Sequence, residues 1–259
     1  RSITAETTFT PETSTGTMEV EFTFDASAIE SGTSVVVFET LYEVHSEDGV
    51  NKEIEVATHE DIEDEGQTVN FIDIFTNASS ENGSNEQQET EKEVTLTDTV
   101  TYEGLQIGEK YTVSGKLMNK ETDKPLLNAD GNEITAETTF TPEESNGTVD
   151  VEFIFDLTGI EAGTDIVVFE SLYHDGIEVA VHADIEDEDQ TIHIIDVQTE
   201  AESQNGTHTA PTGSEVTIID HVSYTNLEVG KEYKVSGKLM NKETGEPLLD
   251  ADGNEITAE

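Results

Sequence analysis

An internal repeat constrains this chain more than any other feature of its sequence. The segment from Gly115 to Thr122 recurs from Gly237 to Thr244, an offset of 122 residues, and Ile134 to Glu137 recurs at the same offset from Ile256 to Glu259. Self-similarity at a fixed spacing indicates repeated structural units. A period near 120 residues is too long for a solenoid repeat and matches the size of one domain. We therefore expect a tandem array of similar domains.

The repeat divides the chain into one complete unit and two halves. Residues 1–72 are the C-terminal half of a unit, residues 73–195 form a complete unit, and residues 196–259 are the N-terminal half of a third. The two halves are complementary, so the last one would be completed by residues 7–72 of the next copy. Successive units follow each other with almost no linker, which predicts a stiff rod.

Short alternating segments separated by turn residues predict an all-β fold. Thr17 to Phe24 alternates between polar and apolar residues with the period of two that a half-buried strand requires. Turn-forming pairs such as Asp130-Gly131 and Asp175-Gly176 separate segments of this kind. Cysteine is absent and hydrophobic residues make up 33% of the chain, so thin sheets with solvated outer faces are expected. The pattern indicates tandem β-sandwich domains of immunoglobulin type forming a rod.

The charge excludes several classes of partner. The chain has 59 acidic and 11 basic residues and a formal net charge of -48. Nucleic acids and anionic membrane surfaces would be repelled by such a surface. A solvated surface, of the kind suited to high salt, explains the acidity better than divalent-cation sites. The acidic turn from Asp250 to Glu255 lacks the spacing of a calcium loop, and we expect no metal and no cofactor.

One set of polar residues occurs twice in the same order. Each copy begins with a Glu at the end of an apolar Val-Phe run, followed by a His, then by an Asp five residues later and a Gln eight residues after the His. Apolar strands that lead into this sequence place the set near a core. A chain that needed only solubility would not preserve such an order. The two sets are Glu39, His59, Asp64 and Gln67, and Glu170, His182, Asp187 and Gln190.

These motifs resemble the repeats of Gram-positive surface adhesins, which carry an intramolecular Thr–Gln ester bond. The resemblance rests on Val167 to Glu170, Asp98 to Leu105, Gly115 to Met118 and the closing His182 to Thr191 segment. It implies that a Thr hydroxyl on the first strand attacks the carboxamide of Gln190 and releases ammonia. By resemblance, His182 and Asp187 activate the hydroxyl and Glu170 polarises the carboxamide, with the division between Glu170 and Asp187 left open. A weak nucleophile and a weak electrophile need such help.

The nucleophile must be a Thr that occurs in both units. Thr99 fails this condition because its counterpart is His221. Thr95 has a counterpart in Thr217, and Thr76 has one in Thr199. The resemblance places the nucleophile at the start of the unit, which favours Thr76 over Thr95.

The resemblance implies a structural stalk of an extracellular adhesin or pilus-like filament at the cell surface, either anchored to the cell wall or part of a filament. The ester bond forms once and without turnover, so the chain is not expected to be an enzyme. A second site would be split, with Thr199 of one copy joined to Gln67 of the next, beside Glu39, His59 and Asp64. Partners would then be identical copies or neighbouring repeats. A lectin-like binding module and a self-processing hydrolase are the alternatives.

Overall fold

A computed structural model of the chain describes residues 3–47, 50–88, 93–212 and 215–258. The prediction of an all-β fold is confirmed, because the described residues form strands, one 3-10 helix and no α-helix. No helix among these residues has the length and apolar character needed to cross a membrane. The chain forms two compact units, Arg1–Asp196 and Val197–Glu259.

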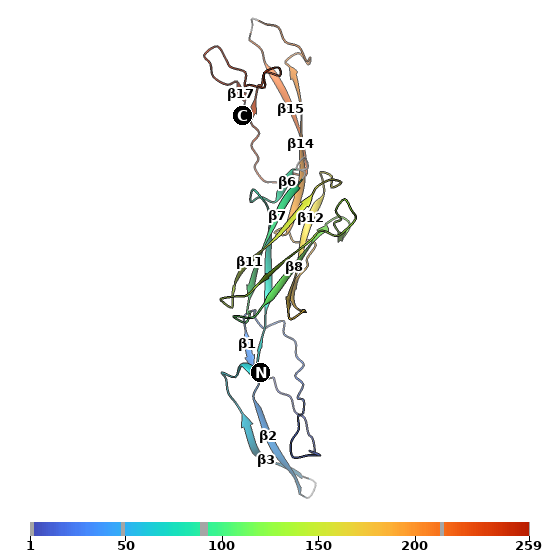
Figure 1. The fold of residues 1–259 in the computed structure, drawn as a ribbon, viewed down its shortest axis with the longest axis vertical. Coiled ribbons are helices and arrows are strands. Elements are labelled where there is room, and N and C mark those ends of the chain that lie inside the picture. Colours follow the sequence, from blue (N-terminus) through green and yellow to red (C-terminus); the bar gives the residue numbers. More distant parts are fainter. Residues whose placement is uncertain (1–2, 48–49, 89–92, 213–214, 259) are drawn as a thin grey trace. The chain divides into compact units, whose positions relative to one another are not determined.

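The strands of the first unit fall into an N-terminal group and a central group (Figure 1). The N-terminal group contains β1 (Ser34–Val36), β2 (Glu39–Glu47), β3 (Val50–His59), the 3-10 helix η1 (Glu65–Gln67) and β4 (Thr68–Asn70). The central group contains β5 (Asp73–Ser80), β6 (Glu86–Gln88), β7 (Glu93–Glu103), β8 (Tyr111–Asn119), β9 (Lys124–Pro125), β10 (Thr135–Phe140), β11 (Gly147–Asp156), β12 (Asp165–His174), β13 (Ile177–His182) and β14 (Thr191–Ser203). The chain continues with β15 (Ile218–Thr225), β16 (Gly237–Lys238) and β17 (Thr257–Ala258).

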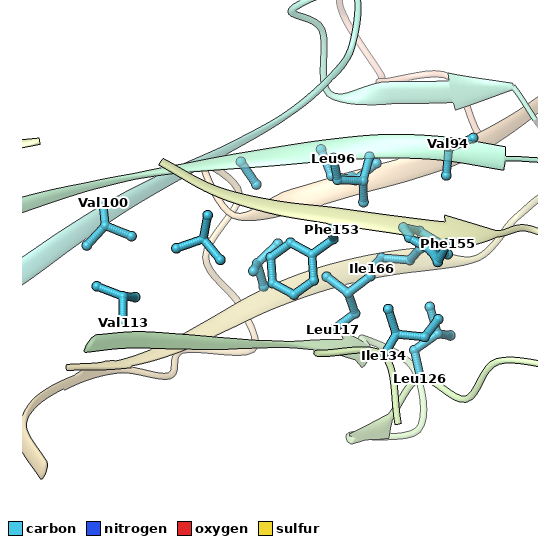
Figure 2. Packing of buried hydrophobic residues seen from close by; sticks show 14 of the residues in the cluster. Val94, Leu96, Val100, Val113, Leu117, Leu126, Ile134, Phe153, Phe155 and Ile166 are labelled. Carbon is cyan, nitrogen blue, oxygen red and sulfur yellow. The ribbon is translucent and has the colours of Figure 1, made fainter. Parts of the chain in front are cut away.

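The central group is a sandwich of two sheets. One sheet has the order β11-β7-β5, and the other has the order β10-β8-β12-β14, with β13, β6 and β9 added to its strands. The end of β14 runs into the second unit, which contains its further neighbour β15. Their inner faces enclose a hydrophobic core that includes Leu96, Leu117, Phe153 and Ile166 (Figure 2). Alternation along each strand sends every second side chain into this core. We refer to residues 73–195 as the central module.

The N-terminal group contains only the ladders β1–β4 and β2–β3. The segment from Thr17 to Phe24, for which the alternation predicts a strand, forms none, so that prediction was wrong. Its equivalent in the central module is β11, which pairs with β7, a strand from the other half of the module. A strand needs a neighbour for its backbone groups, and residues 1–72 contain no equivalent of β7. We refer to the described residues 3–72 as the N-terminal half, after their place in the chain, although they correspond to the C-terminal half of a repeat unit.

The second unit repeats local features of the central module. Ser80 hydroxyl donates to Asn82 Oδ1 and to the Ser84 carbonyl, and Ser203 hydroxyl donates in the same way to Asn205 Oδ1 and the Thr207 carbonyl. This shared turn shows that the strands preceding it are equivalent in the two units. The strand carries Thr76 in one unit and Thr199 in the other. We refer to residues 197–258 as the C-terminal half, after their place in the chain, although they correspond to the N-terminal half of a repeat unit.

Candidate functional site

Four polar side chains lie inside the hydrophobic core of the central module. Thr76 is on β5, Asp98 on β7 and Glu170 on β12, and Gln190 directly precedes β14; all four are buried. Each strand residue takes an inward position in its alternating pattern: Asp98, for example, lies between the fully buried Leu96 and Val100. The strand pattern that builds the core therefore also delivers these groups to it.

Backbone contacts bring the two sheets together at Gln190. The amide of Ala78 on β5 donates to the Asp189 carbonyl at 3.0 Å, and the amide of Val168 on β12 donates to the Gln190 carbonyl at 3.2 Å. Gln190 is thus held between the strand that carries Thr76 and the strand that carries Glu170. In the ladder between β5 and β7, Ala78 lies opposite Asp98.

Most polar atoms of this cluster are not satisfied by ordinary hydrogen bonds. Gln190 Nε2 donates to Asp98 Oδ1 at 3.1 Å. Among the described residues, five further buried side-chain oxygens find no partner of good geometry. Buried groups of this kind are costly and need an explanation, of which a reactive site is one. They are Thr76 Oγ1, Asp98 Oδ2, both carboxyl oxygens of Glu170, and Gln190 Oε1.

The two buried carboxyls perturb each other although neither Glu170 oxygen makes a hydrogen bond of good geometry. Burial, followed by the charge of Asp98, raises the pKa of Glu170 to about 10, and the Thr76 hydroxyl opposes this shift. Burial also raises the pKa of Asp98. Two carboxyls that cannot both ionise retain a proton, so Glu170 is a neutral acid at pH 7. A neutral carboxylic acid can donate to an amide oxygen.

His182 and Asp187 form a second pair beside the carboxyls. His182 Nε2 and Asp187 Oδ2 are 2.8 Å apart, which leaves Nδ1 as the ring nitrogen free of Asp187. His182 lies directly opposite Glu170 in the β12–β13 ladder, so both side chains leave the same face. Asp187 is thus paired with His182, whereas Glu170 lies with Asp98 in the core.

The two alternative threonines point away from this cluster. The buried residues of β7 are Val94, Leu96, Asp98, Val100 and Tyr102, so Thr95 and Thr99 occupy the opposite face. Thr99 hydroxyl donates to Asp150 Oδ1 at 2.8 Å on that face. Of the three candidates, Thr76 alone is buried with Gln190.

Comparison with known proteins assigns the family. The family described as "T-Q ester bond containing domain" matches residues 1–71, 72–194 and 195–259. The chain belongs to this family. The resemblance inferred from the sequence motifs is therefore confirmed, and each of the three segments is a T-Q ester bond containing domain or part of one. Among curated proteins, no sequence matches the chain.

Solved structures similar to the chain are distant in sequence. Two are crystal forms of a bacterial adhesin from Mobiluncus mulieris that contains intramolecular disulfide, isopeptide and ester bond cross-links. The P1 form has 13% identity and a TM-score of 0.41, covering 72% of this chain and 76% of that chain. The P21 form has 13% identity and a TM-score of 0.39, covering 60% and 75%. A glycosyl hydrolase family 2 member from Bacteroides cellulosilyticus has 8% identity and a TM-score of 0.35, covering 51% and 16%.

The N-terminal half repeats several contacts of the central cluster. His59 Nε2 and Asp64 Oδ2 are 2.8 Å apart, Glu39 lies opposite His59, and the Gln67 carbonyl accepts from Val37. These contacts repeat those of the central module. The exposure differs, because the His59 side chain is 52% exposed and that of His182 is 22% exposed. Thr199, the predicted partner of Gln67, is exposed in the other unit.

Asp98 is the site residue that the sequence analysis did not single out. It occupies an inward position of an otherwise alternating apolar strand, where a carboxylate is unexpected. It also recurs as Asp220, at the offset of 122 residues that relates the repeats. A charged residue at an inward strand position, kept in both T-Q units, was the signal available for it.

Proposed function

We propose that the central module forms an ester bond between Thr76 and Gln190 in a single autocatalytic step. The observation that supports this proposal most is the burial of a hydroxyl, a carboxamide and two carboxyls together in a hydrophobic core, most of their oxygens without hydrogen bonds. Such an arrangement is unfavourable unless it reacts or exchanges partners. Membership of the T-Q ester bond containing domain family supports the same reaction.

In the proposed reaction, the Thr76 hydroxyl oxygen attacks the side-chain carbonyl carbon of Gln190. His182, oriented by Asp187, takes the hydroxyl proton and delivers it to the departing nitrogen. Glu170, kept neutral beside Asp98, polarises the carboxamide in a site closed to water. The carbon–nitrogen bond breaks, the carbon–oxygen bond forms, and ammonia leaves. The protein is consumed as substrate, so there is no turnover.

We propose that the chain serves as a structural stalk of an extracellular adhesin or filament at the cell surface. The support is family membership and the resemblance of its motifs to surface-adhesin repeats. A covalent bond between β5 and the residue before β14 would enclose nearly the whole module in one covalent loop. A pulling force applied at the two ends of the module would then pass through the ester and leave the sheets unloaded.

The same reaction is proposed for the split site, with Thr199 and Gln67 as the reacting pair and Glu39, His59 and Asp64 in the supporting roles. The complementary segment comes from a neighbouring repeat or from another copy. Support comes from the preformed His59–Asp64 pair and from the opposite placement of Glu39 and His59.

Intact mass of the denatured chain tests the proposal. The Thr76→Ala variant should lack the loss of one ammonia that the parent shows in the central module, whereas Thr95→Ala should retain it. A loss that persists in Thr76→Ala would exclude this nucleophile. The self-processing alternative would convert Gln190 to Glu and make the chain slightly heavier, so the sign of the mass change separates the two reactions.

A further inference from the structure

Both residues that connect the N-terminal half to the central module are packed. Phe71 and Ile72 are the two residues between β4 and β5. The ring centroid of Phe71 lies 6.3 Å from that of Phe24 in the N-terminal half, whereas Ile72 packs against the core of the central module. The two connecting residues are therefore tied to different sides, and the rotation that a flexible linker would allow is restricted.

A loop of the N-terminal half also holds the backbone of this connection. The Gly32 amide donates to the Phe71 carbonyl and the Phe71 amide donates to the Thr33 carbonyl, both at 2.8 Å. These two bonds fix both backbone groups of Phe71. In the central module, the loop at residues 163–164 makes the same two bonds to Ile194, both at 2.9 Å. The backbone clamp therefore recurs at the end of both repeat units.

A turn of the central module contacts the same loop from the other side. The Ser31 hydroxyl donates to a carboxylate oxygen of Glu103. The next residue, Gly104, approaches so closely that a Cβ on it would lie 2.7 Å from the Phe71 carbonyl oxygen and 3.1 Å from Gly32 Cα. The backbones of Gly104 and Gly32 thus touch without an intervening side chain, which only glycine allows at such a distance.

We propose that this contact is a rigid joint that holds the N-terminal half and the central module in one orientation. The joint consists of residues 31–33, Phe71 and residues 103–104. Domains joined in one chain move relative to each other by default. Here paired backbone hydrogen bonds, a hydroxyl–carboxylate bond and a close glycine contact oppose that motion. Such a joint would let a lateral force act on the modules without bending the chain between them, and it does not depend on the ester chemistry.

Gly104→Ala tests the joint. The added Cβ would meet the Phe71 carbonyl and the Gly32 backbone, neither of which is the end of a flexible side chain. Because φ of Gly104 is +80°, alanine is also strained there. Gly108→Ala is the matched control, since φ of Gly108 is +82° and a Cβ on it has nothing within 4 Å. The control therefore imposes similar backbone strain on the same module without touching the joint.

Spin labels on the full-length chain measure the orientation. The chain has no cysteine, so two introduced cysteines carry the only labels. Glu55→Cys on β3 and Glu152→Cys on β11 lie at exposed positions on the two sides of the joint. Double electron–electron resonance should give one narrow distance between them in the parent and in Gly108→Ala. In Gly104→Ala we expect this narrow distance to be lost and replaced by a broad distribution.

A second label pair reports on the fold of the central module. Glu137→Cys on β10 and Glu152→Cys on β11 are both exposed and belong to the same module. Their distance should stay narrow in every variant. Ser31→Ala provides a variant without backbone strain, because it removes only the bond to Glu103. It should broaden the distance across the joint, although less than Gly104→Ala does.

A broad distance across the joint in the parent, or equal distributions in Gly104→Ala and Gly108→Ala, would overturn the proposal. If Gly104→Ala also broadens the distance within the central module, Ser31→Ala decides, and an unchanged distance across the joint in that variant would overturn it. All labelled chains keep Thr76 and Gln190, so their intact mass still reports the ester. Failure of the joint would therefore leave the proposed function standing.

Discussion

Two carboxylic acids in the core of the central module are the most unusual residues in the structure. Asp98 and Glu170 come from opposite sheets and meet where a hydrophobic contact would otherwise form. Burying two ionised carboxylates together would cost several kcal/mol, so the pair keeps a proton. The core thereby loses stability and gains an acid that is neutral at pH 7.

Replacing Glu170 by Gln tests whether this proton matters. The neutral amide preserves volume and leaves the core intact, but it cannot share a proton with Asp98. We predict that the ester forms at least about 100-fold more slowly, in the range expected for loss of a general acid. The rate is followed by intact mass after refolding. Glu178→Gln, an exposed acid on β13, should leave the rate unchanged.

The raised pKa of Glu170 also predicts how stability depends on pH when the ester is absent. The pKa rises from 4.5 in the unfolded chain to about 10 in the fold, so the folded state binds the proton more tightly. This contribution is complete below about pH 4.5 and is lost progressively as pH rises towards 10.

Thermal unfolding of Thr76→Ala is the measurement. Its midpoint should be lower at pH 9 than at pH 6, and the double variant Thr76→Ala with Glu170→Gln should lose most of this difference. An equal decline in both variants would show that other groups cause the pH dependence.

At the scale of strands, the sequence predicted which polar residues lie close together better than the strands that hold them. The doubled order of Glu, His, Asp and Gln, with its family resemblance, identified both sets, because spacing along a loop and a strand is local. Asp98 was missed because its importance depends on the opposite sheet. The strand expected from Thr17 to Phe24 is absent because its partner is not in the same half. The alternation of polar and apolar residues indicates which face of a strand each residue would occupy. A strand forms only where a neighbouring strand is present to pair with it.

The ester should stabilise the central module through chain entropy. A cross-link from residue 76 to residue 190 closes a loop of roughly 100 residues, and the loop-entropy relation established for disulfides gives such a closure about 4 to 5 kcal/mol. Thr76→Ala should lose stability of this order in urea unfolding of the central module. Thr95→Ala, on the outer face of β7, should stay near the parent value.

Gly115 tests the packing between the sheets. A Cβ on Gly115 would lie 2.6 Å from Phe153 Cζ, so Gly115→Ala should destabilise the central module by about 1 to 3 kcal/mol. Gly237 is the equivalent glycine in the C-terminal half and has no neighbour within 4 Å. Gly237→Ala should therefore leave the stability of the chain unchanged. Urea unfolding measures the two variants.

At the scale of the whole molecule, the acidity opposes assembly. A net charge of -48 means that two copies repel each other as they approach. Salt screens charges more than about 10 Å apart at 0.1 M. Formation of a Thr199–Gln67 ester between two copies should therefore accelerate as salt rises from low concentration, whereas the ester within the central module should form at a constant rate. Equal salt dependence of both reactions would contradict this account.

The most direct test of the central claim is peptide mapping of the denatured chain by tandem mass spectrometry. Proteolysis should release the peptide that contains Thr76 joined to the peptide that contains Gln190, with a combined mass lower by one ammonia and fragments that locate the bond at these two side chains. Recovery of the two peptides separately, with Thr76 free and Gln190 still an amide, would contradict the account.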